Sequence, residues 1–302
     1  MSHLQDVLDV DDLPDVEAVL DLGAELKAAH ADGEPIRRLP DRTLAMLFEQ
    51  PSTRTRLSFE TGMTLLGGHA MMLSPDDMQL GRGEPIADTG RVLSRYVDVV
   101  MVRTAEHATV ETLAESASVP VVNGLTDRAH PCQTLADLLT VREAFGGFDD
   151  VTAAWVGDGN NVACSFAVGA SMVGLDVTVA TPEGYELRPD VLERAAANPG
   201  DVETTTDPAD AVAGADVVYT DVWVSMGHDA ERERRLRDFE GFQVNGDLLA
   251  GAAPDAKVLH CLPAHRGEEI TEDVLLSDAS LVWDQAENRM HAQNGLLVWL
   301  LG

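Results

Sequence analysis

The sequence predicts an α/β protein with two doubly wound domains, each built on a parallel sheet, joined by interdomain helices. Short runs rich in β-branched residues alternate with longer stretches whose apolar residues recur at helical spacing. The chain has 302 residues, of which 45% are hydrophobic, so it is long enough to form two cores. Polar residues directly follow several of the predicted strands, where ligands bind in sheets of this kind.

The expected strands are short and apolar, as buried parallel strands are. They cover residues 43–48, 97–102, 119–122, 151–156, 177–180, 217–219, 258–259 and 281–283. A helix is expected from Pro131 to Phe145, and the glycines and aspartates that follow it mark a boundary. We therefore expect one domain over residues 1–145 and a second over residues 146–285. A C-terminal helix over residues 286–302 is expected to pack back on the first domain.

The composition restricts the possible partners. The formal net charge is −31, with 52 acidic residues against 21 basic ones. A surface this acidic repels nucleic acid and anionic lipid, so we expect neither as a partner. The acids are spread along the chain, which argues against an acidic tail and leaves extra solubility or adaptation to high salt. Because unscreened like charges strain a compact state, we expect a halophilic protein from a salt-rich cytoplasm.

Other features favour a cytoplasmic protein. The three cysteines, Cys132, Cys164 and Cys261, form no C-x-x-C pair and are odd in number, which is typical of reduced thiols. The mixed, acidic start of the chain resembles neither a signal peptide nor a transit peptide. No stretch is long and apolar enough to span a bilayer. No metal-ligand spacing is present, so no metal is expected.

The first candidate site follows the strand at 43–48. Ser52, Thr53, Arg54 and Thr55 begin a helical pattern, so backbone N–H groups, hydroxyls and a guanidinium would meet there. An anion site and a plain helix cap with exposed arginines are equally compatible with this motif. Arg103 follows the next strand and is either a second anion ligand or a surface charge.

His130 and Gln133 lie three residues apart at the start of the helix at 131–145. They would share one face of its first turn and could bind a carbonyl oxygen and an NH₂ group. A histidine before a proline is also a frequent cap, so this motif alone decides nothing.

The loop after the strand at 151–156 only partly resembles a dinucleotide-binding loop. Val162 stands where the third glycine of G-x-G-x-x-G would be, so nucleotide binding is not expected. Asn160 and Asn161 could instead hold the carboxylate and amine of an amino acid.

Three more candidates follow later strands. Asp221 could hold an ammonium group or be an ordinary turn aspartate. Cys261, followed by Leu-Pro, could be a small buried hydrophobe or a thiolate near a reaction centre. Arg289, at the start of the last helix, could bind an anion or lie on the surface.

Taken together and in this order, the motifs resemble those of ornithine carbamoyltransferases over essentially the whole chain. The motifs shared with all carbamoyltransferases are Ser52-Thr53-Arg54-Thr55 and His130-Pro131-Cys132-Gln133. Those that resemble the ornithine branch are Asp221 with Ser225-Met226-Gly227, and His260-Cys261-Leu262-Pro263; Glu287-Asn288-Arg289 completes the set.

The resemblance implies transfer of the carbamoyl group of carbamoyl phosphate to the δ-amine of L-ornithine, giving L-citrulline and phosphate in arginine metabolism. It also implies a homo-oligomer, either a trimer or a multiple of trimers, with active sites between neighbouring subunits and no cofactor. The carbamoyl phosphate ligands that it implies are Ser52, Thr53, Arg54, Thr55, Gln79, Arg103, His130, Gln133, Cys261, Leu262 and Arg289, with Gln79 reaching the adjacent subunit's site. The implied ornithine ligands are Asn161, Asp221, Ser225 and Met226, and the implied catalytic residues are Cys261, Asp221, Arg103 and His130.

The alternatives differ mainly in the second substrate. Aspartate carbamoyltransferase is disfavoured because a dicarboxylate needs cations where this chain offers Asp221 and Cys261. Putrescine and modified ornithines stay open, as does the physiological direction of the reaction. A nucleotide-linked oxidoreductase lacks its glycine fingerprint, and a non-catalytic binding protein would have no use for the full set of strand-end groups.

Overall fold

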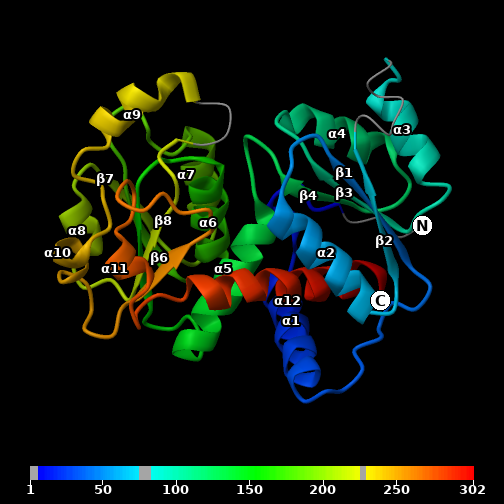
Figure 1. Ribbon diagram of the computed structural model, residues 1–302, viewed down its shortest axis with the longest axis horizontal. Coiled ribbons are helices and arrows are strands. Elements are labelled where there is room, and N and C mark those ends of the chain that lie inside the picture. The colour runs from blue at the N-terminus through cyan, green and yellow to red at the C-terminus, as the bar shows by residue number, and fades with distance from the viewer. Residues whose placement is uncertain (1–5, 75–82, 225–228) are drawn as a thin grey trace. The chain divides into compact units, whose positions relative to one another are not determined.

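A computed structural model describes residues 6–74, 83–224 and 229–302 of the chain (Figure 1). The chain forms two compact units, one of residues Met1–Leu139 and Asn288–Gly302 and the other of Thr140–Glu287. The two boundaries fall within α5 (Pro131–Phe145) and α12 (Val282–Leu301), so these helices join the units. Among the described helices, none has both the length and the apolar character that a membrane span needs.

The first unit contains a four-stranded sheet in the order β2-β1-β3-β4, with every neighbouring pair parallel. Its strands are β1 (Thr43–Phe48), β2 (His69–Leu73), β3 (Val99–Arg103) and β4 (Val121–Leu125), and its helices include α1 (Val16–Ala31), α2 (Thr53–Leu65), α3 (Ile86–Leu93) and α4 (His107–Ser116). Alternate residues of β1 and β3 point to opposite faces, yet nearly all are buried. Both faces are therefore covered, as expected of a parallel sheet.

The second unit contains a five-stranded parallel sheet in the order β7-β6-β5-β8-β9. Its strands are β5 (Thr152–Val156), β6 (Asp176–Ala180), β7 (Val202–Thr205), β8 (Val217–Thr220) and β9 (Lys257–His260). Its helices are α6 (Asn161–Met172), α7 (Pro189–Ala195), α8 (Pro208–Val212), α9 (Arg232–Asp238), α10 (Gly246–Leu249) and α11 (Glu272–Leu275). The chain runs outward from β5 to β7 and then returns to add β8 and β9 on the other side, so the strand order reverses between β5 and β8.

The predicted fold class is confirmed, and seven of the expected strands correspond to β1, β3, β4, β5, β6, β8 and β9. The strand expected at 281–283 is wrong. Leu281 does donate a backbone hydrogen bond to Val258 of β9 (2.9 Å), but α12 begins at the next residue. Two strands, β2 and β7, were missed. Both are partly exposed edge strands; β2 (His-Ala-Met-Met-Leu) contains no β-branched or aromatic residue, and β7 (Val-Glu-Thr-Thr) is mostly polar.

Close contacts pack the end of α12 within the first unit. A Cβ on Gly295 would lie 2.5 Å from the Val19 carbonyl oxygen of α1, and one on Gly62 of α2 would collide with the Asn294 side chain. Glycine at these positions therefore allows the α12 backbone to approach α1 and α2.

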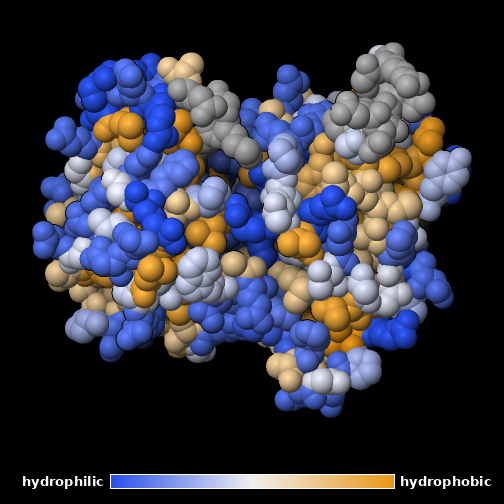
Figure 2. Space-filling view, viewed as in Figure 1, coloured by the Kyte–Doolittle hydropathy of each residue, from blue (hydrophilic) through white to orange (hydrophobic). Residues whose placement is uncertain are grey.

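Figure 2 shows hydrophilic residues spread over the visible surface, which agrees with the dispersed acidic residues.

Candidate active site

In the first unit, Ser52 and Thr55 shape the start of α2. Ser52 is the N-cap, and its Oγ accepts a hydrogen bond from the Thr55 N–H (3.3 Å). Ser is a preferred N-cap because its oxygen satisfies an N–H that has no partner within the helix. The interpretation of Ser52 as a helix cap is thus correct. The other N–H groups of the first turn of α2 point away from the helix and can bind an anion placed before it.

The Thr55 hydroxyl connects this turn to two arginines. Its Oγ1 accepts from Arg289 Nη2 (3.1 Å) and from Arg103 Nη1 (3.5 Å). Arg103 ends β3, beside β1 in the sheet, and Arg289 comes from α12. Both arginines are about 95% buried, with exposed fractions of 5% and 4%. The expectation that either could be a surface charge is therefore wrong.

Arg289 also orients the amide at the start of α5. Its Nη1 donates to Gln133 Oε1 (2.6 Å), and Gln133 Nε2 donates to Asp137 Oδ1 (2.7 Å). Because the amide oxygen faces the guanidinium and the NH₂ faces the carboxylate, the orientation of Gln133 is defined by opposite charges.

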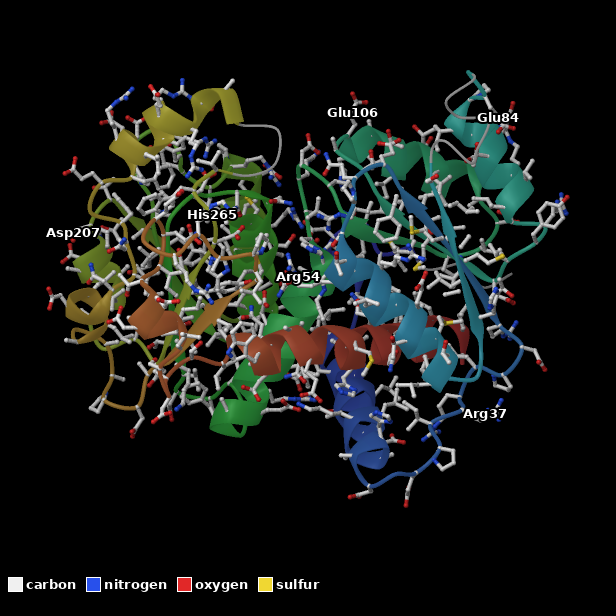
Figure 3. All side chains as sticks on the ribbon, in the orientation of Figure 1. Arg37, Arg54, Glu84, Glu106, Asp207 and His265 are labelled. Atoms are coloured by element: carbon white, nitrogen blue, oxygen red, sulfur yellow. The ribbon has the colours of Figure 1, made fainter. Side chains whose placement is uncertain are left out.

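His130 directly precedes α5 and is buried. Burial lowers the pKa of His130 well below its usual value, and the positive charges of Arg289, Arg103 and Arg54 lower it further. The imidazole is therefore neutral near pH 7 and can form hydrogen bonds without adding charge. Arg54, which is half-buried, lies in the first turn of α2 (Figure 3).

These residues form what we call the arginine cluster, consisting of Arg54, Arg103, Arg289, His130 and the start of α2. Three guanidinium groups and a helix N-terminus favour an anion, and the planar guanidinium matches phosphate oxygens. Thr53 is the first residue of the helix and is exposed. This arrangement suits a phosphate group beside a polar carbonyl.

In the second unit, Asp221 and Cys261 face each other because of the strand register. Thr220 of β8 pairs with His260 of β9, so the residues that follow them leave the sheet side by side. Cys261 Sγ donates to Asp221 Oδ1 (3.0 Å). Asp221 is only 7% exposed, which is not the environment of an ordinary turn aspartate.

Asn160 holds the other oxygen of Asp221. Its Nδ2 donates to Asp221 Oδ2 (2.9 Å), while its Oδ1 accepts from the N–H groups of Val162 (2.9 Å) and Ala163 (3.0 Å). Asn160 is thus the N-cap of α6 and a support of Asp221, a role that the sequence analysis missed. Asn161, the first residue of α6, is half-buried.

The backbone turns sharply after Cys261. Leu262 has a φ of 57°, which bulky residues rarely adopt, and the Leu262–Pro263 peptide bond is cis. The Leu262 N–H donates to His260 Nδ1 (2.9 Å), so the imidazole proton lies on Nε2. That nitrogen is 3.0 Å from Glu269 Oε1, and both side chains are fully buried. The sequence indicated His260 only as part of a motif and gave no sign of Glu269.

A buried ion pair supports the same end of the sheet. Arg235 of α9 donates through Nη1 to Asp158 Oδ2 (2.6 Å) and to the Trp223 carbonyl (2.9 Å). Burial lowers the pKa of Arg235, but the Asp158 carboxylate outweighs it and the pKa is raised. An open cavity of about 480 Å³ lies beside the pair, lined by Tyr185, Arg234 and Asp238 among others, and none of its lining residues is a predicted site residue.

The structure therefore gathers the predicted residues within each unit. Hydrogen bonds join Ser52, Thr55, Arg103, Gln133 and Arg289 in the first unit and Asp221 and Cys261 in the second. Gln79, Ser225 and Met226 lie outside the described residues.

Comparison with known proteins covers both units. The aspartate/ornithine carbamoyltransferase family model of the carbamoyl-P binding domain matches residues 5–143, and that of the Asp/Orn binding domain matches residues 149–300.

Individual relatives are similar over their whole length. An ornithine carbamoyltransferase of Haloquadratum walsbyi is 59% identical, with 100% of this chain and 99% of the relative covered. One from Archaeoglobus fulgidus is 50% identical, with 100% and 98% covered. The solved ornithine carbamoyltransferase of Pyrococcus furiosus superimposes with a TM-score of 0.95 at 51% identity, covering 99% of this chain and 97% of that one. That of Thermus thermophilus gives a TM-score of 0.90 at 47% identity, with 99% of each chain covered.

Proposed function

The chain belongs to the aspartate/ornithine carbamoyltransferase family, and we propose that it transfers the carbamoyl group of carbamoyl phosphate to the δ-amine of L-ornithine. The products are L-citrulline and phosphate. The observation that carries the choice of ornithine is the Asp221–Cys261 pair, because a carboxylate beside a thiol suits an amine and repels a second carboxylate. Residues 1–145 with 286–302 would bind carbamoyl phosphate, and residues 146–285 would bind ornithine.

Carbamoyl phosphate binds the arginine cluster in this proposal. The phosphate accepts hydrogen bonds from the first-turn N–H groups of α2 and from the hydroxyls of Ser52, Thr53 and Thr55. Arg54 and Arg103 supply charge, and the charge on the phosphate grows as it leaves. Groups already held in place, such as Arg103 against Thr55 (3.5 Å), need little reorganisation to stabilise that charge.

The carbamoyl group is oriented by neutral groups. His130 is neutral near pH 7 because burial and the neighbouring arginines lower its pKa, so it can donate one hydrogen bond to the carbonyl oxygen. Gln133, fixed between Arg289 and Asp137, is proposed to bind the carbamoyl NH₂. Positioning of this kind supplies a large part of the rate of a two-substrate reaction.

Ornithine binds through residues of the second unit. A free alkyl ammonium has a pKa of about 10.4, yet the δ-amine must be neutral to attack. We assign Asp221 and Cys261 to hold this amine and to assist the loss of its proton. The nitrogen then forms a bond to the carbamoyl carbon, the bond from that carbon to the phosphate oxygen breaks, and phosphate leaves with the electron pair. Asn161, Ser225 and Met226 would bind the α-carboxylate and α-amine, and Cys261, Leu262 and Arg289 would complete the carbamoyl phosphate site.

Assembly and compartment are part of the proposal. We propose a homotrimer or a multiple of trimers, in which Gln79 contributes to the neighbouring subunit's site, located in the cytoplasm. The similarity to the family and the three cysteines without a disulfide support these assignments. Light scattering coupled to size-exclusion chromatography would test the assembly, and a monomer at assay concentration would contradict it.

The decisive experiment measures citrulline formation from carbamoyl phosphate and L-ornithine in molar KCl, with L-aspartate and putrescine run in parallel. Turnover with L-ornithine alone is expected. Turnover with another amine would keep the proposed role of the arginine cluster and exclude the proposed role of the Asp221–Cys261 pair. Absence of turnover with every acceptor would refute the enzymatic assignment.

A further inference from the structure

Three potential metal ligands meet in the loop that follows β9 and Pro263. A ring nitrogen of His265 and one carboxylate oxygen each of Glu268 and Glu269 lie within 4.8 Å of one another. The distance between His265 Nδ1 and Glu268 Oε2 is 3.7 Å. His265, labelled in Figure 3, belongs to the second unit.

Each of these three side chains has a buried polar atom that lacks a hydrogen bond. Among the residues that the structure describes, none forms a hydrogen bond with His265 Nδ1, Glu268 Oε2 or Glu269 Oε2, although all three atoms are inaccessible to solvent. Buried polar atoms of this kind are rare because each has lost its hydrogen bonds to water without a replacement. Three of them in one place indicate that a positively charged or hydrogen-bearing species is accommodated there.

The remaining atoms of the two carboxylates are held in place. Glu269 Oε1 accepts from the His265 N–H (2.5 Å) and lies 3.0 Å from His260 Nε2, and the Glu269 side chain is completely buried. Glu268 Oε1 pairs with Arg232 of α9. Glu268 therefore keeps Oε2 near His265 Nδ1 (3.7 Å), and Glu269 keeps a buried Oε2 without a hydrogen bond among the described residues. The bonds to the other oxygens are the second-sphere support that metal ligands generally have.

We propose that His265, Glu268 and Glu269 bind a divalent transition-metal cation, with Zn²⁺ as the type case. One imidazole nitrogen and two carboxylate oxygens form a common ligand set for such ions, whereas Mg²⁺ and Ca²⁺ prefer oxygen ligands alone. Zn²⁺ binds these ligands at about 2.0–2.2 Å, so adjacent ligand atoms of a tetrahedral site lie about 3.3 Å apart. The observed 3.7 Å between His265 and Glu268 requires a contraction of only a few tenths of an ångström.

A nearby group of three side chains does not offer the same chemistry. Asp221, His260 and Cys261 each offer one potential ligand atom, and these three atoms also lie within 4.8 Å of one another. However, Cys261 Sγ donates to Asp221, and both ring nitrogens of His260 are engaged, one by the Leu262 N–H and the other by Glu269. Binding an ion there would break hydrogen bonds, while binding at His265 would satisfy acceptors that have no hydrogen bond.

The proposed ion would be structural. It would join the loop after Pro263 to α9 through Glu268 and Arg232, and to β9 through Glu269 and His260. It takes no part in carbamoyl transfer, so the inference does not rest on the proposed function. The alternative occupant of the cluster is a proton shared between His265 and a carboxylate, which would need no metal.

Titration of chelator-treated protein with Co²⁺ distinguishes these possibilities. Co²⁺ replaces Zn²⁺ in nitrogen and oxygen sites, and its visible absorption reports the binding. We expect one Co²⁺ per chain in the unmodified protein and in His69→Asn, a control variant in which the replaced histidine is exposed. His265→Asn and Glu268→Gln should each weaken binding by about tenfold or more, since even changes around a metal's ligands have effects of this size.

Two further measurements keep the result interpretable. Thermal unfolding without metal establishes that the variants are folded, and Zn²⁺ at a hundredfold excess over its Kd should stabilise the unmodified protein by about 2.7 kcal/mol. Cys261→Ser should retain the Co²⁺ site. No Co²⁺ binding at millimolar concentration, equal binding by His265→Asn, or loss of binding only in Cys261→Ser would each overturn the proposal.

Discussion

Replacement of Arg54 by alanine tests the arginine cluster directly. The side chain is half-buried in the first turn of α2, and its charge is one of the causes that lower the pKa of His130. Alanine is an excellent helix former, so the substitution should leave α2 intact. We expect a higher KM for carbamoyl phosphate and a lower kcat, because the phosphate gains charge as it leaves.

The structure places the effect at the lower end of the usual range. A hydrogen bond to a charged group contributes about 1.5–3 kcal/mol, which corresponds to roughly 10- to 150-fold in kcat/KM. Arg54 is more exposed than Arg103 and Arg289, and it follows them among the charges that act on His130. Solvent screening should therefore limit the loss to roughly 10- to 30-fold.

Arg56→Ala is the matched control. Arg56 lies two residues further along α2 and pairs with Glu60 (3.0 Å) on the surface, with side-chain exposures of 50% and 32%. An exposed pair of this spacing contributes about 0.3–0.5 kcal/mol to stability, so its loss should change kcat/KM less than about twofold. Steady-state kinetics with carbamoyl phosphate as the varied substrate decide between them. If Arg54→Ala and Arg56→Ala behave alike, Arg54 is not in the site.

Three further predictions concern the thiol, the imidazole and the net charge. Iodoacetamide should modify Cys261, which is partly exposed, in preference to the buried Cys132 and Cys164. The modification should abolish turnover unless ornithine is present. Mass spectrometry that finds Cys261 alkylated in fully active protein would contradict this. Folding lowers the pKa of His130, so as the pH falls below about 6.5 the unfolded chain binds a proton before the folded chain does. The contribution of His130 to the free energy of unfolding is therefore complete above that pH. Below it, this contribution is lost by up to about 1.4 kcal/mol per pH unit. His130→Gln should lack this pH dependence, so the difference in unfolding free energy between the variant and the unmodified protein, measured in urea, should change with pH across this window. An identical pH dependence of the two proteins would refute the assignment. The chain has a net charge of −31, and salt screens the repulsion between its like charges. The free energy of unfolding should therefore rise from low to molar KCl, because the Debye length falls from about 10 Å at 0.1 M to about 3 Å at 1 M. An unfolding free energy that does not change with KCl would argue against adaptation to salt.

Of the strands that the structure describes, the sequence predicted every central one but missed two of the edge strands, β2 and β7. Central strands such as β1 and β3 are buried on both faces and therefore read as continuous apolar runs. The edge strands β2 and β7 are partly exposed; β2 (His-Ala-Met-Met-Leu) has no β-branched residue, and β7 (Val-Glu-Thr-Thr) is mostly polar. The error at residues 281–283 has a similar origin, since a short apolar run fits a strand or a helix start equally well.

The partners within the site were harder to predict than its members. Asp158 and Arg235 are 77 residues apart, and Asn160 and Asp221 are 61 apart, so no local spacing joins them. Glu269 follows Glu268 in an acidic chain and carries no distinguishing signal, yet it is fully buried against His260. Only the strand register and the packing of α9 show which of the many acids are structural.

Several of the site residues that the sequence predicted share a topological cause. In the first sheet the strand order reverses between β1 and β3, and Ser52 and Arg103 come from the carboxyl ends of those two strands. In the second sheet it reverses between β5 and β8, which are followed by Asn160 and Asp221. At such a reversal the two connecting segments run to opposite faces and leave the strand ends open for a ligand. Polar residues after these strands were therefore informative, and so were His130 and Cys261, which follow the edge strands β4 and β9. The two groups of residues also differ in charge, with arginines in the first unit and a carboxylate beside a thiol in the second, which matches an anionic carbamoyl donor and a cationic acceptor.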